Sequence, residues 1–218
     1  MIRTVSIVPT ILTDNKQDYR EQAEKINVFT RRVQIDITDG VFTPVETLDI
    51  TNVWWPKNWE ADLHLMVANP SEHLDTVLKL GPSLCILHAE ANEDLTPSFN
   101  ALHEAGIKVG VALHPSTFPG AVKNYIDMAD HVLIFAGQLG VQGSPADLMQ
   151  MEKIPLVRNM KPEVEIGWDG GANMTNVRAL AHADLDVINV GSAISMADDP
   201  AEAFQQLVAE IDKNGVVL

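Results

Sequence analysis

The residues best suited to chemistry lie in a short apolar stretch that carries Gln34, Asp36 and Thr38 at alternate positions. Side chains alternate between the two faces of a strand, so these three polar side chains are expected to share one face. If both faces of the strand are covered, a carboxylate such as Asp36 needs an ion-pair partner, a metal ion or a place in an active site. The stretch therefore predicts either a buried polar network or a catalytic carboxylate.

Eight short apolar or alternating runs, each followed by a segment with helical periodicity, form the framework around this stretch. Repeated strand and helix units of this kind are typical of parallel sheets. We expect an α/β fold, a single-domain (β/α)8 TIM barrel over residues 1–218, with its chemistry at the carboxyl ends of the strands. The predicted strands are residues 5–9, 33–37, 61–66, 84–88, 108–113, 131–135, 164–168 and 187–190.

Two of the predicted helices have recognisable ends. Pro70 should begin the helix after the third strand, and Gly81 should end it. Pro200 should begin the last helix, which Asn214-Gly215 should end. Between the second and third strands the chain has no strong periodicity, and we expect its tryptophans to pack in the outer layer or at a subunit contact. They are Trp54, Trp55 and Trp59.

Composition narrows the classes of function. The chain has 218 residues, 46% of them hydrophobic, and a formal net charge of −15, which disfavours binding to nucleic acid or to anionic membranes. The single cysteine, Cys85, lies in an apolar run, so we expect a buried thiol and no intrachain disulfide. We interpret the protein as cytoplasmic, because the sequence shows no signal peptide and no membrane-spanning run.

Polar residues gather where the predicted strands end, which is where a barrel places its active site. Isolated buried His or Asp residues are often structural, but several at corresponding strand ends indicate a site. The residues concerned are Thr10, Gln34, Asp36, Asp62, His64, Met66, His88, Glu90, His114, Ser116, Thr117 and Asp169.

Glycines in the last three strand-to-helix loops give a second signal. A glycine lets an anion approach the backbone closely, and barrels often bind phosphate in the loops after strands seven and eight. An acidic protein could hold a phosphorylated substrate in this way, although glycines also serve simple tight turns. The positions are Gly137, Gly140, Gly143, Gly170, Gly171, Gly191 and the adjacent Ser192.

Over nearly its whole length the chain resembles ribulose-phosphate 3-epimerases, a family of (β/α)8 barrels of the ribulose-phosphate-binding type. The matching segments surround Pro9-Thr10, residues 34–44, residues 62–67, residues 88–90, residues 169–171 and residues 191–193. The resemblance implies an isomerase of carbohydrate metabolism that inverts C3 of a phosphorylated ketose, such as ribulose 5-phosphate, through an enediolate. It also implies a homo-oligomer.

The resemblance assigns roles to individual residues. It implies that Asp36 and Asp169 exchange protons with C3, and that His64, Asp36 and Asp169 bind a divalent metal (Zn, Mn, Fe or Mg). It places the phosphate on Gly170, Gly171, Gly191 and Ser192, with the loop of Gly140 and Gly143 closing over it. Thr10 and Met66 complete the predicted substrate site.

The chain also departs from the family pattern. Gln34 stands where the family has a metal-binding histidine, Thr10 where it has serine, and Thr38 and Phe135 where it has methionine. A neutral amide oxygen at Gln34 favours a hard ion such as Mg²⁺ or Mn²⁺, or no metal. Phe135, together with Gln142 in place of a loop glycine, should reshape the substrate pocket.

Two other functions stay open from the sequence alone. The altered Gln34 and loop would also suit a catalytically silent or re-purposed barrel that binds a sugar phosphate. A decarboxylase or aldol-type synthase on the same fold is a third reading, but such enzymes use an Asp-x-Lys-x-x-Asp array. Here the corresponding strand, which runs from Asp36 to Asp39, has no lysine.

Overall fold

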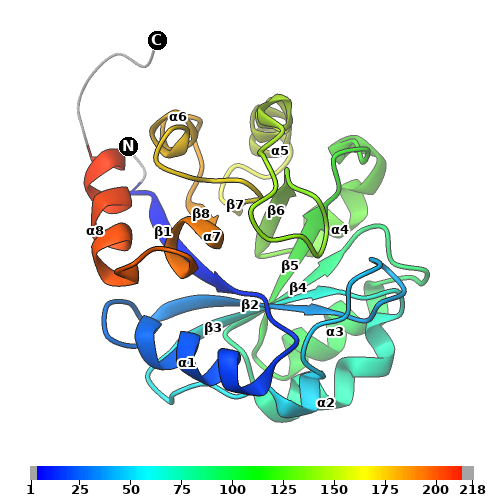
Figure 1. Cartoon of the computed structure of the whole chain (residues 1–218). Helices are drawn as coiled ribbons and strands as arrows, with labels where there is room; N and C mark the ends of the chain where they lie inside the picture. Colours follow the sequence, from blue (N-terminus) through cyan, green and yellow to red (C-terminus); the bar gives the residue numbers. More distant parts are fainter. Residues whose placement is uncertain (1–3, 213–218) are drawn as a thin grey trace.

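In a computed structural model, which describes residues 4–212, the chain forms a closed barrel of eight parallel strands in sequential order (Figure 1). Each strand pairs with the next along the chain, and the first pairs with the last. The predicted TIM barrel is therefore confirmed. The strands are β1 (Ser6–Ile11), β2 (Arg32–Thr38), β3 (Glu60–Met66), β4 (Leu84–His88), β5 (Lys108–Leu113), β6 (His131–Phe135), β7 (Glu165–Asp169) and β8 (Val187–Val190).

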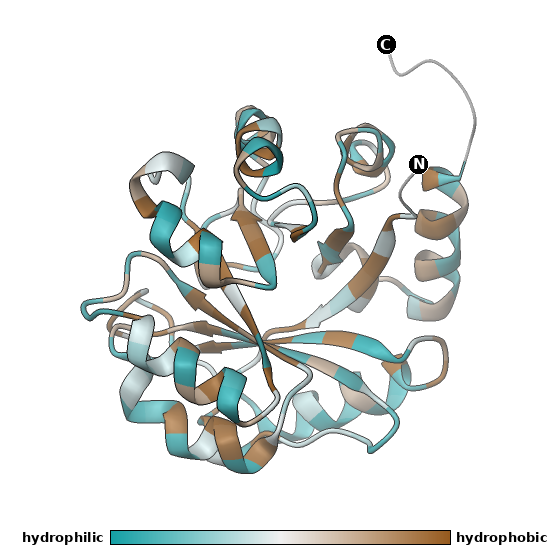
Figure 2. Ribbon diagram, turned by 180° about the vertical axis from the view of Figure 1, so that it is seen from behind, coloured by the Kyte–Doolittle hydropathy of each residue, from teal (hydrophilic) through white to brown (hydrophobic). Residues whose placement is uncertain are grey.

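Helices surround the barrel on its outer side (Figure 1). They carry both apolar and polar residues, so that one side of each can pack on the strands (Figure 2). None of the helices in residues 4–212 has the length and apolar character to cross a membrane. The helices are α1 (Lys16–Ile26), α2 (Leu74–Leu80), α3 (Thr96–Glu104), α4 (Lys123–Met128), α5 (Lys153–Met160), α6 (Val177–Ala181), α7 (Ser192–Ser195) and α8 (Pro200–Ile211).

Four predicted strands, β4, β5, β6 and β8, have the predicted bounds. The largest difference is at β1, which was expected to end at Pro9 and continues to Ile11. Pairing with the next strand explains the extension, because Thr10 and Ile11 lie opposite Gln34 and Ile35 of β2. Thr10 is therefore held by the barrel itself and not by a loop.

The observed helix ends agree in part with those predicted from the sequence. Pro70 begins a 3₁₀ turn, Pro70–His73, and α2 starts only after it. Gly81 ends α2 with a left-handed φ of 62°, and its N–H donates to the carbonyl of Val77. Pro200 begins α8, whose first turn is capped by the side chain of Asp199. The end predicted at Asn214-Gly215 lies outside the described residues.

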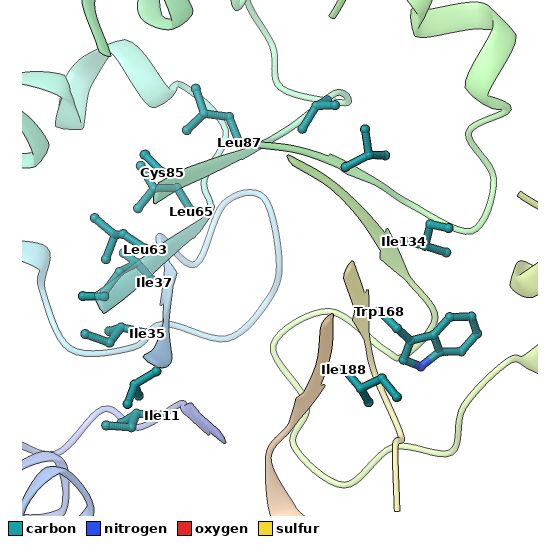
Figure 3. Close-up of a cluster of buried hydrophobic side chains, with 14 of the residues drawn as sticks. Ile11, Ile35, Ile37, Leu63, Leu65, Cys85, Leu87, Ile134, Trp168 and Ile188 are labelled. Atoms are coloured by element: carbon teal, nitrogen blue, oxygen red, sulfur yellow. The ribbon is translucent and has the colours of Figure 1, made fainter. Parts of the chain in front are cut away.

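The main core lies between the strands and the surrounding helices. The apolar face of β2, made by Val33, Ile35 and Ile37, is buried there, and Figure 3 shows its neighbours from other strands pointing outward from the barrel in the same way. Cys85 belongs to this layer, where burial raises the pKa of its thiol to about 12. The prediction of a buried cysteine is confirmed.

The tryptophans of the segment between β2 and β3 pack in the outer layer. Trp59 is buried and its indole N–H donates to Asn27 Oδ1 at 3.0 Å. Trp55 packs against the core from a partly buried position, whereas Trp54 is 41% exposed and contacts the ring of Tyr19 edge-on. Packing in the outer layer is confirmed, and a subunit contact through Trp54 stays a prediction.

The inside of the barrel holds few apolar residues and many polar ones. Because side chains alternate, the faces of β2 and β3 opposite the outer core carry Arg32, Gln34, Asp36, Asp62 and His64 toward the barrel axis. All except Arg32 are buried. A small separate apolar cluster accompanies them inside, made of Leu84, Ile86, Ala112 and Leu133.

Arg32 holds together the amino-terminal end of the barrel. Its Nε lies 2.8 Å from Asp62 Oδ2, and its two terminal nitrogens donate to the two carboxylate oxygens of Glu165 at 2.8 and 2.7 Å. His131 Nδ1 lies 2.7 Å from the same carboxylate. Burial raises the pKa of Asp62 in spite of Arg32, whereas at Glu165 the hydrogen bonds from Arg32 and His131 outweigh burial and lower the pKa.

We predict that Arg32→Met destabilises the fold by about 2–4 kcal/mol, because it leaves two carboxylates without their cation and Arg32 is mostly buried. Glu165 has a lowered folded-state pKa, so its ion pair stabilises the fold above its ordinary pKa of 4.5, and this contribution is lost as the pH falls through the folded-state value. Urea unfolding of both proteins should show the full difference at neutral pH and a smaller one below pH 4.5. An equal difference at every pH would contradict the assigned role of Glu165.

Candidate active site

A pocket opens where the carboxyl ends of the strands meet the loops after β6, β7 and β8. Thr10, Asp36, Met66 and Asp169 reach it from strands of the barrel, as the barrel rule predicts. The predicted residues that line it are Thr10, Asp36, Met66, Gly140, Gly143, Asp169, Gly170, Gly171, Gly191 and Ser192. Gln34 and His64 lie behind this lining and are fully buried.

Four side chains form a compact polar cluster at the base of the pocket. The amide nitrogen of Gln34 donates to Asp36 Oδ1 at 2.9 Å and to Asp169 Oδ2 at 2.7 Å. His64 Nδ1 lies 2.9 Å from Asp36 Oδ1 and 3.5 Å from Asp169 Oδ2. Neighbouring strands β2 and β3 supply three of these groups, and the distant β7 brings Asp169 to them only because the barrel closes.

The pKa of Asp169 is raised above its usual range, first by burial and then by the negative charge of Asp36. The nearby His64 and the hydrogen bond from Gln34 oppose these effects without cancelling them. Two carboxyl groups this close favour a state in which one keeps a proton while the other is ionised. Such a pair can remove a proton from one atom and return a proton to it.

A second row of polar groups supports the cluster from β4. His64 Nε2 lies 2.9 Å from His88 Nε2, and His88 Nδ1 lies 3.3 Å from Glu90 Oε2. Burial lowers the pKa of His88 to about 4, while hydrogen bonds from His88 and Thr117 help lower the pKa of the half-buried Glu90 to about 2 against the opposite effect of burial. A neutral His88 therefore orients the ring of His64 so that its Nδ1 faces the two aspartates.

The donor atoms of the site fit a divalent metal only in part. Asp36, His64 and Asp169 offer ligand atoms that all lie within 4.8 Å of one another, close enough to hold an ion. The fit fails at Gln34, because its N–H groups, and not its carbonyl oxygen, point at these atoms. An amide in this orientation and a cation compete for the same lone pairs.

The loop between β6 and the 3₁₀ turn before α5, residues 137–147, folds over the other two glycine loops. A Cβ on Gly170 (φ 111°) would lie 2.1 Å from the backbone nitrogen of Gly137, and one on Gly171 (φ 67°) would lie 2.2 Å from that of Ala146. On the side of β8, the amide of Gln142 donates to Ser195 Oγ at 3.0 Å. The loop is thus closed onto the pocket through contacts that only glycine permits.

Several lining residues were not in the predicted site. Phe135 and Gln142 were expected to reshape the pocket, and both line it. Gln138, Val141 and Ser144 could have been found from their place between or beside the predicted loop glycines, and the hydroxyl of Ser144 accepts from the Gln138 N–H at 2.9 Å. Nothing in the sequence distinguished the remaining ones, Leu12 and Ala172.

Other predicted strand-end residues lie elsewhere. Asp62 shares a face with His64, but it belongs to the Arg32 network at the opposite end of the barrel. His114 bonds to Ser116 Oγ at 2.8 Å, and neither lines the pocket. The position of Asp62 has a simple cause, since a strand face extends through the whole barrel and only its carboxyl end reaches the pocket. His114 and Ser116 follow the carboxyl end of β5 but stay outside the pocket lining.

The chain is similar in sequence to known proteins of one family. Residues 6–195 match the model of the ribulose-phosphate 3 epimerase family. A ribulose-phosphate 3-epimerase of Schizosaccharomyces pombe is 29% identical over 181 residues, which cover 80% of this chain and 79% of that protein. A chloroplastic ribulose-5-phosphate-3-epimerase of Arabidopsis thaliana is 27% identical, with 94% of this chain and 76% of the relative covered.

Among solved structures, a 3-hexulose-6-phosphate synthase superposes with a TM-score of 0.69. The match covers 94% of this chain and 98% of the other, at 20% sequence identity. At this identity the likeness supports the barrel fold alone.

We predict that Gly171→Ala displaces the closed loop, because the new Cβ would meet the backbone of Ala146. A non-glycine residue at this φ also costs about 1–2 kcal/mol. Gly81→Ala is a matched control, with a φ of 62° and no atom within 4 Å of the added Cβ. Hydrogen exchange should speed up across residues 137–147 in Gly171→Ala only; equal exchange in the two variants would show that the contact does not hold the loop.

Proposed function

Because the chain belongs to the ribulose-phosphate 3-epimerase family, we propose that it inverts C3 of ribulose 5-phosphate, or of a close analogue, by proton transfer through an enediolate. Asp36 and Asp169 are the proposed acid and base. The observation that carries the proposal is that these two carboxyl groups, from β2 and β7, meet in one pocket, which the loop of residues 137–147 covers.

The reaction needs two proton-transfer groups that act on opposite faces of one carbon. An ionised carboxylate takes the C3 proton, which is acidified by the neighbouring ketone, and a protonated carboxyl group gives a proton to the other face. The raised pKa of Asp169 supports this division, since one member of the pair keeps its proton. In the reverse direction the two residues exchange roles, so the same site serves both epimers.

The phosphate is proposed to bind at Gly170, Gly171, Gly191 and Ser192. These residues line the same pocket as Asp36, and Gly191 directly precedes the short helix α7. A Cβ on Gly191 would lie 2.9 Å from Thr10 Oγ1, so the space beside this backbone is narrow. Glycine lets an anion reach backbone N–H groups there in spite of the net negative charge of the protein.

The closed loop, residues 137–147, lines the pocket together with the strand ends and the glycines that follow β7 and β8. Gln138, Gln142 and Ser144 bring polar groups toward the bound ketose, while Phe135 and Met66 supply apolar surface. Such a loop excludes water from the enediolate and so protects it from side reactions. Loop opening is then needed for substrate entry and product release.

The decarboxylase or synthase reading receives no support from the site. Those reactions were expected to need a lysine beside the aspartates, and none of the described residues that line the pocket is a lysine. The buried Lys153 donates instead to the carbonyl oxygens of His114 and Pro115. The likeness to 3-hexulose-6-phosphate synthase therefore concerns the barrel and not the proposed chemistry.

We predict that Asp36→Asn and Asp169→Asn each lower turnover of ribulose 5-phosphate by about 10²–10⁴-fold, the usual contribution of a general acid or base. Epimerisation in D₂O, followed by NMR, should place deuterium at C3 with the native protein. Each variant keeps the carboxyl group on one face of C3, so it should still exchange the C3 proton slowly with one of the two epimers. The epimer that exchanges should differ between the two variants. Exchange with the same epimer in both would contradict the two-base mechanism.

We predict that removal of the phosphate from the substrate lowers kcat/KM by about 10²–10⁴-fold. Loss of two hydrogen bonds to a charged group corresponds to about 3–6 kcal/mol. Parallel assays with ribulose and ribulose 5-phosphate measure the effect. Similar values for the two sugars would remove the proposed phosphate site.

A further inference from the structure

The amide of Gln34 occupies an unusual position in the polar cluster. Its nitrogen lies 2.9 Å from Asp36 Oδ1, 2.7 Å from Asp169 Oδ2 and 3.4 Å from His64 Nδ1. Asp36, His64 and Asp169 are also the three residues whose ligand atoms are close enough to share a metal ion. One neutral N–H₂ group thus contacts every member of the only such set found among the described residues.

The surroundings of Gln34 fix which end of the amide faces the aspartates. An ionised carboxylate can only accept hydrogen bonds, and a carboxyl group that keeps its proton still accepts through its carbonyl oxygen, so Asp36 and Asp169 can both accept from the N–H₂ end. The opposite orientation would place the amide oxygen against at least one ionised carboxylate, which is unfavourable unless a cation lies between them. In the structure that oxygen points away and has no hydrogen-bond partner, although Gln34 is fully buried.

The unpartnered oxygen is the unfavourable side of this arrangement. A buried carbonyl without a partner is unfavourable, and a half turn of the amide would bring it to the polar cluster. Even so, the N–H₂ end of the Gln34 amide, and not its oxygen, faces the polar cluster. The amide therefore does what a bound cation would otherwise do at this point: it offers positive charge density to two carboxyl groups and keeps them together.

We propose that Gln34 replaces the divalent metal of the site: its N–H₂ group bridges Asp36 and Asp169 as a positioning residue, and turnover needs no bound metal ion. The inference rests on the proposed epimerase function for its statement about turnover, but its statement about metal binding stands independently. His64 completes the bridge, since its ring is held by His88 with Nδ1 toward the same carboxylates.

The first test uses the native full-length protein, purified without chelator. Elemental analysis should find well below one divalent ion per chain, and calorimetric titration with Mn²⁺ should show no stoichiometric binding at micromolar concentration. Dialysis against a chelator should leave the rate of C3 deuterium exchange unchanged. One tightly bound ion per chain, or turnover that is lost with chelator and restored by Mn²⁺ or Zn²⁺, would overturn the proposal.

The second test changes the amide alone. Gln34→Glu has nearly the same size but replaces the donor with a third carboxylate, whose repulsion a cation relieves, so Mn²⁺ should bind at about one ion per chain and at least about 100-fold more tightly than to the native protein. Gln205→Glu, on the exposed surface of α8, makes the same change in net charge and should gain no ion. Failure of a folded Gln34→Glu to bind Mn²⁺ would show that the amide does not determine metal binding.

The two proposals fail in different ways. If ribulose 5-phosphate is not turned over but the Mn²⁺ titrations follow the expected pattern, the substrate is wrong and the role of Gln34 holds. If turnover is present but depends on a metal, the epimerase proposal holds and the role of Gln34 is wrong. Should Gln34→Glu not fold, the metal content and chelator response of the native protein still decide the inference.

Discussion

The cost of burying charge inside a closed barrel is the constraint on which this structure depends. Each ionised group there must be paired or lose its charge, because the barrel excludes most of the water. The chain solves this problem differently at the two ends. At the amino-terminal end Arg32 forms ion pairs with both Asp62 and Glu165, which connects three strands of the barrel. At the carboxyl end no arginine or lysine of residues 4–212 lines the pocket, and the two aspartates share an amide and a retained proton.

This contrast explains why one end is structural and the other suits proton transfer. Glu165, held by the guanidinium of Arg32 and by His131, has a lowered pKa and is a poor proton carrier at neutral pH, although at Asp62 burial outweighs the same guanidinium. Asp169 has its pKa shifted upward and can keep or release a proton there. Carboxyl groups thus have two roles inside one barrel, and Glu165 and Asp169 differ in the charge of the nearest donor.

Much of the fold and part of the site could be predicted from the sequence. The eight repeated strand and helix units predicted the barrel, and alternation within the second strand predicted the inward position of Asp36. Closure of the barrel brings Asp169 next to it. The depth of a residue along the barrel axis could not be predicted from the sequence. Asp62 and His64 are two positions apart on one strand and yet belong to networks at different ends of the barrel. The orientation of the Gln34 amide also lies beyond local pattern, since residues from three strands determine it.

The Gln34 bridge has a consequence for the conditions under which the protein can work. A ferrous ion bound by carboxylates and imidazole is open to oxidation by peroxide, and any metal ion at such a site can be lost when cells limit its supply. The carboxamide of Gln34 is not oxidised by peroxide as a ferrous ion is, and it is part of the polypeptide, so it cannot be lost from the site. The proposed amide-bridged site would therefore keep its activity through oxidative stress and metal starvation, and buried Cys85, with its raised pKa, adds no reactive thiol.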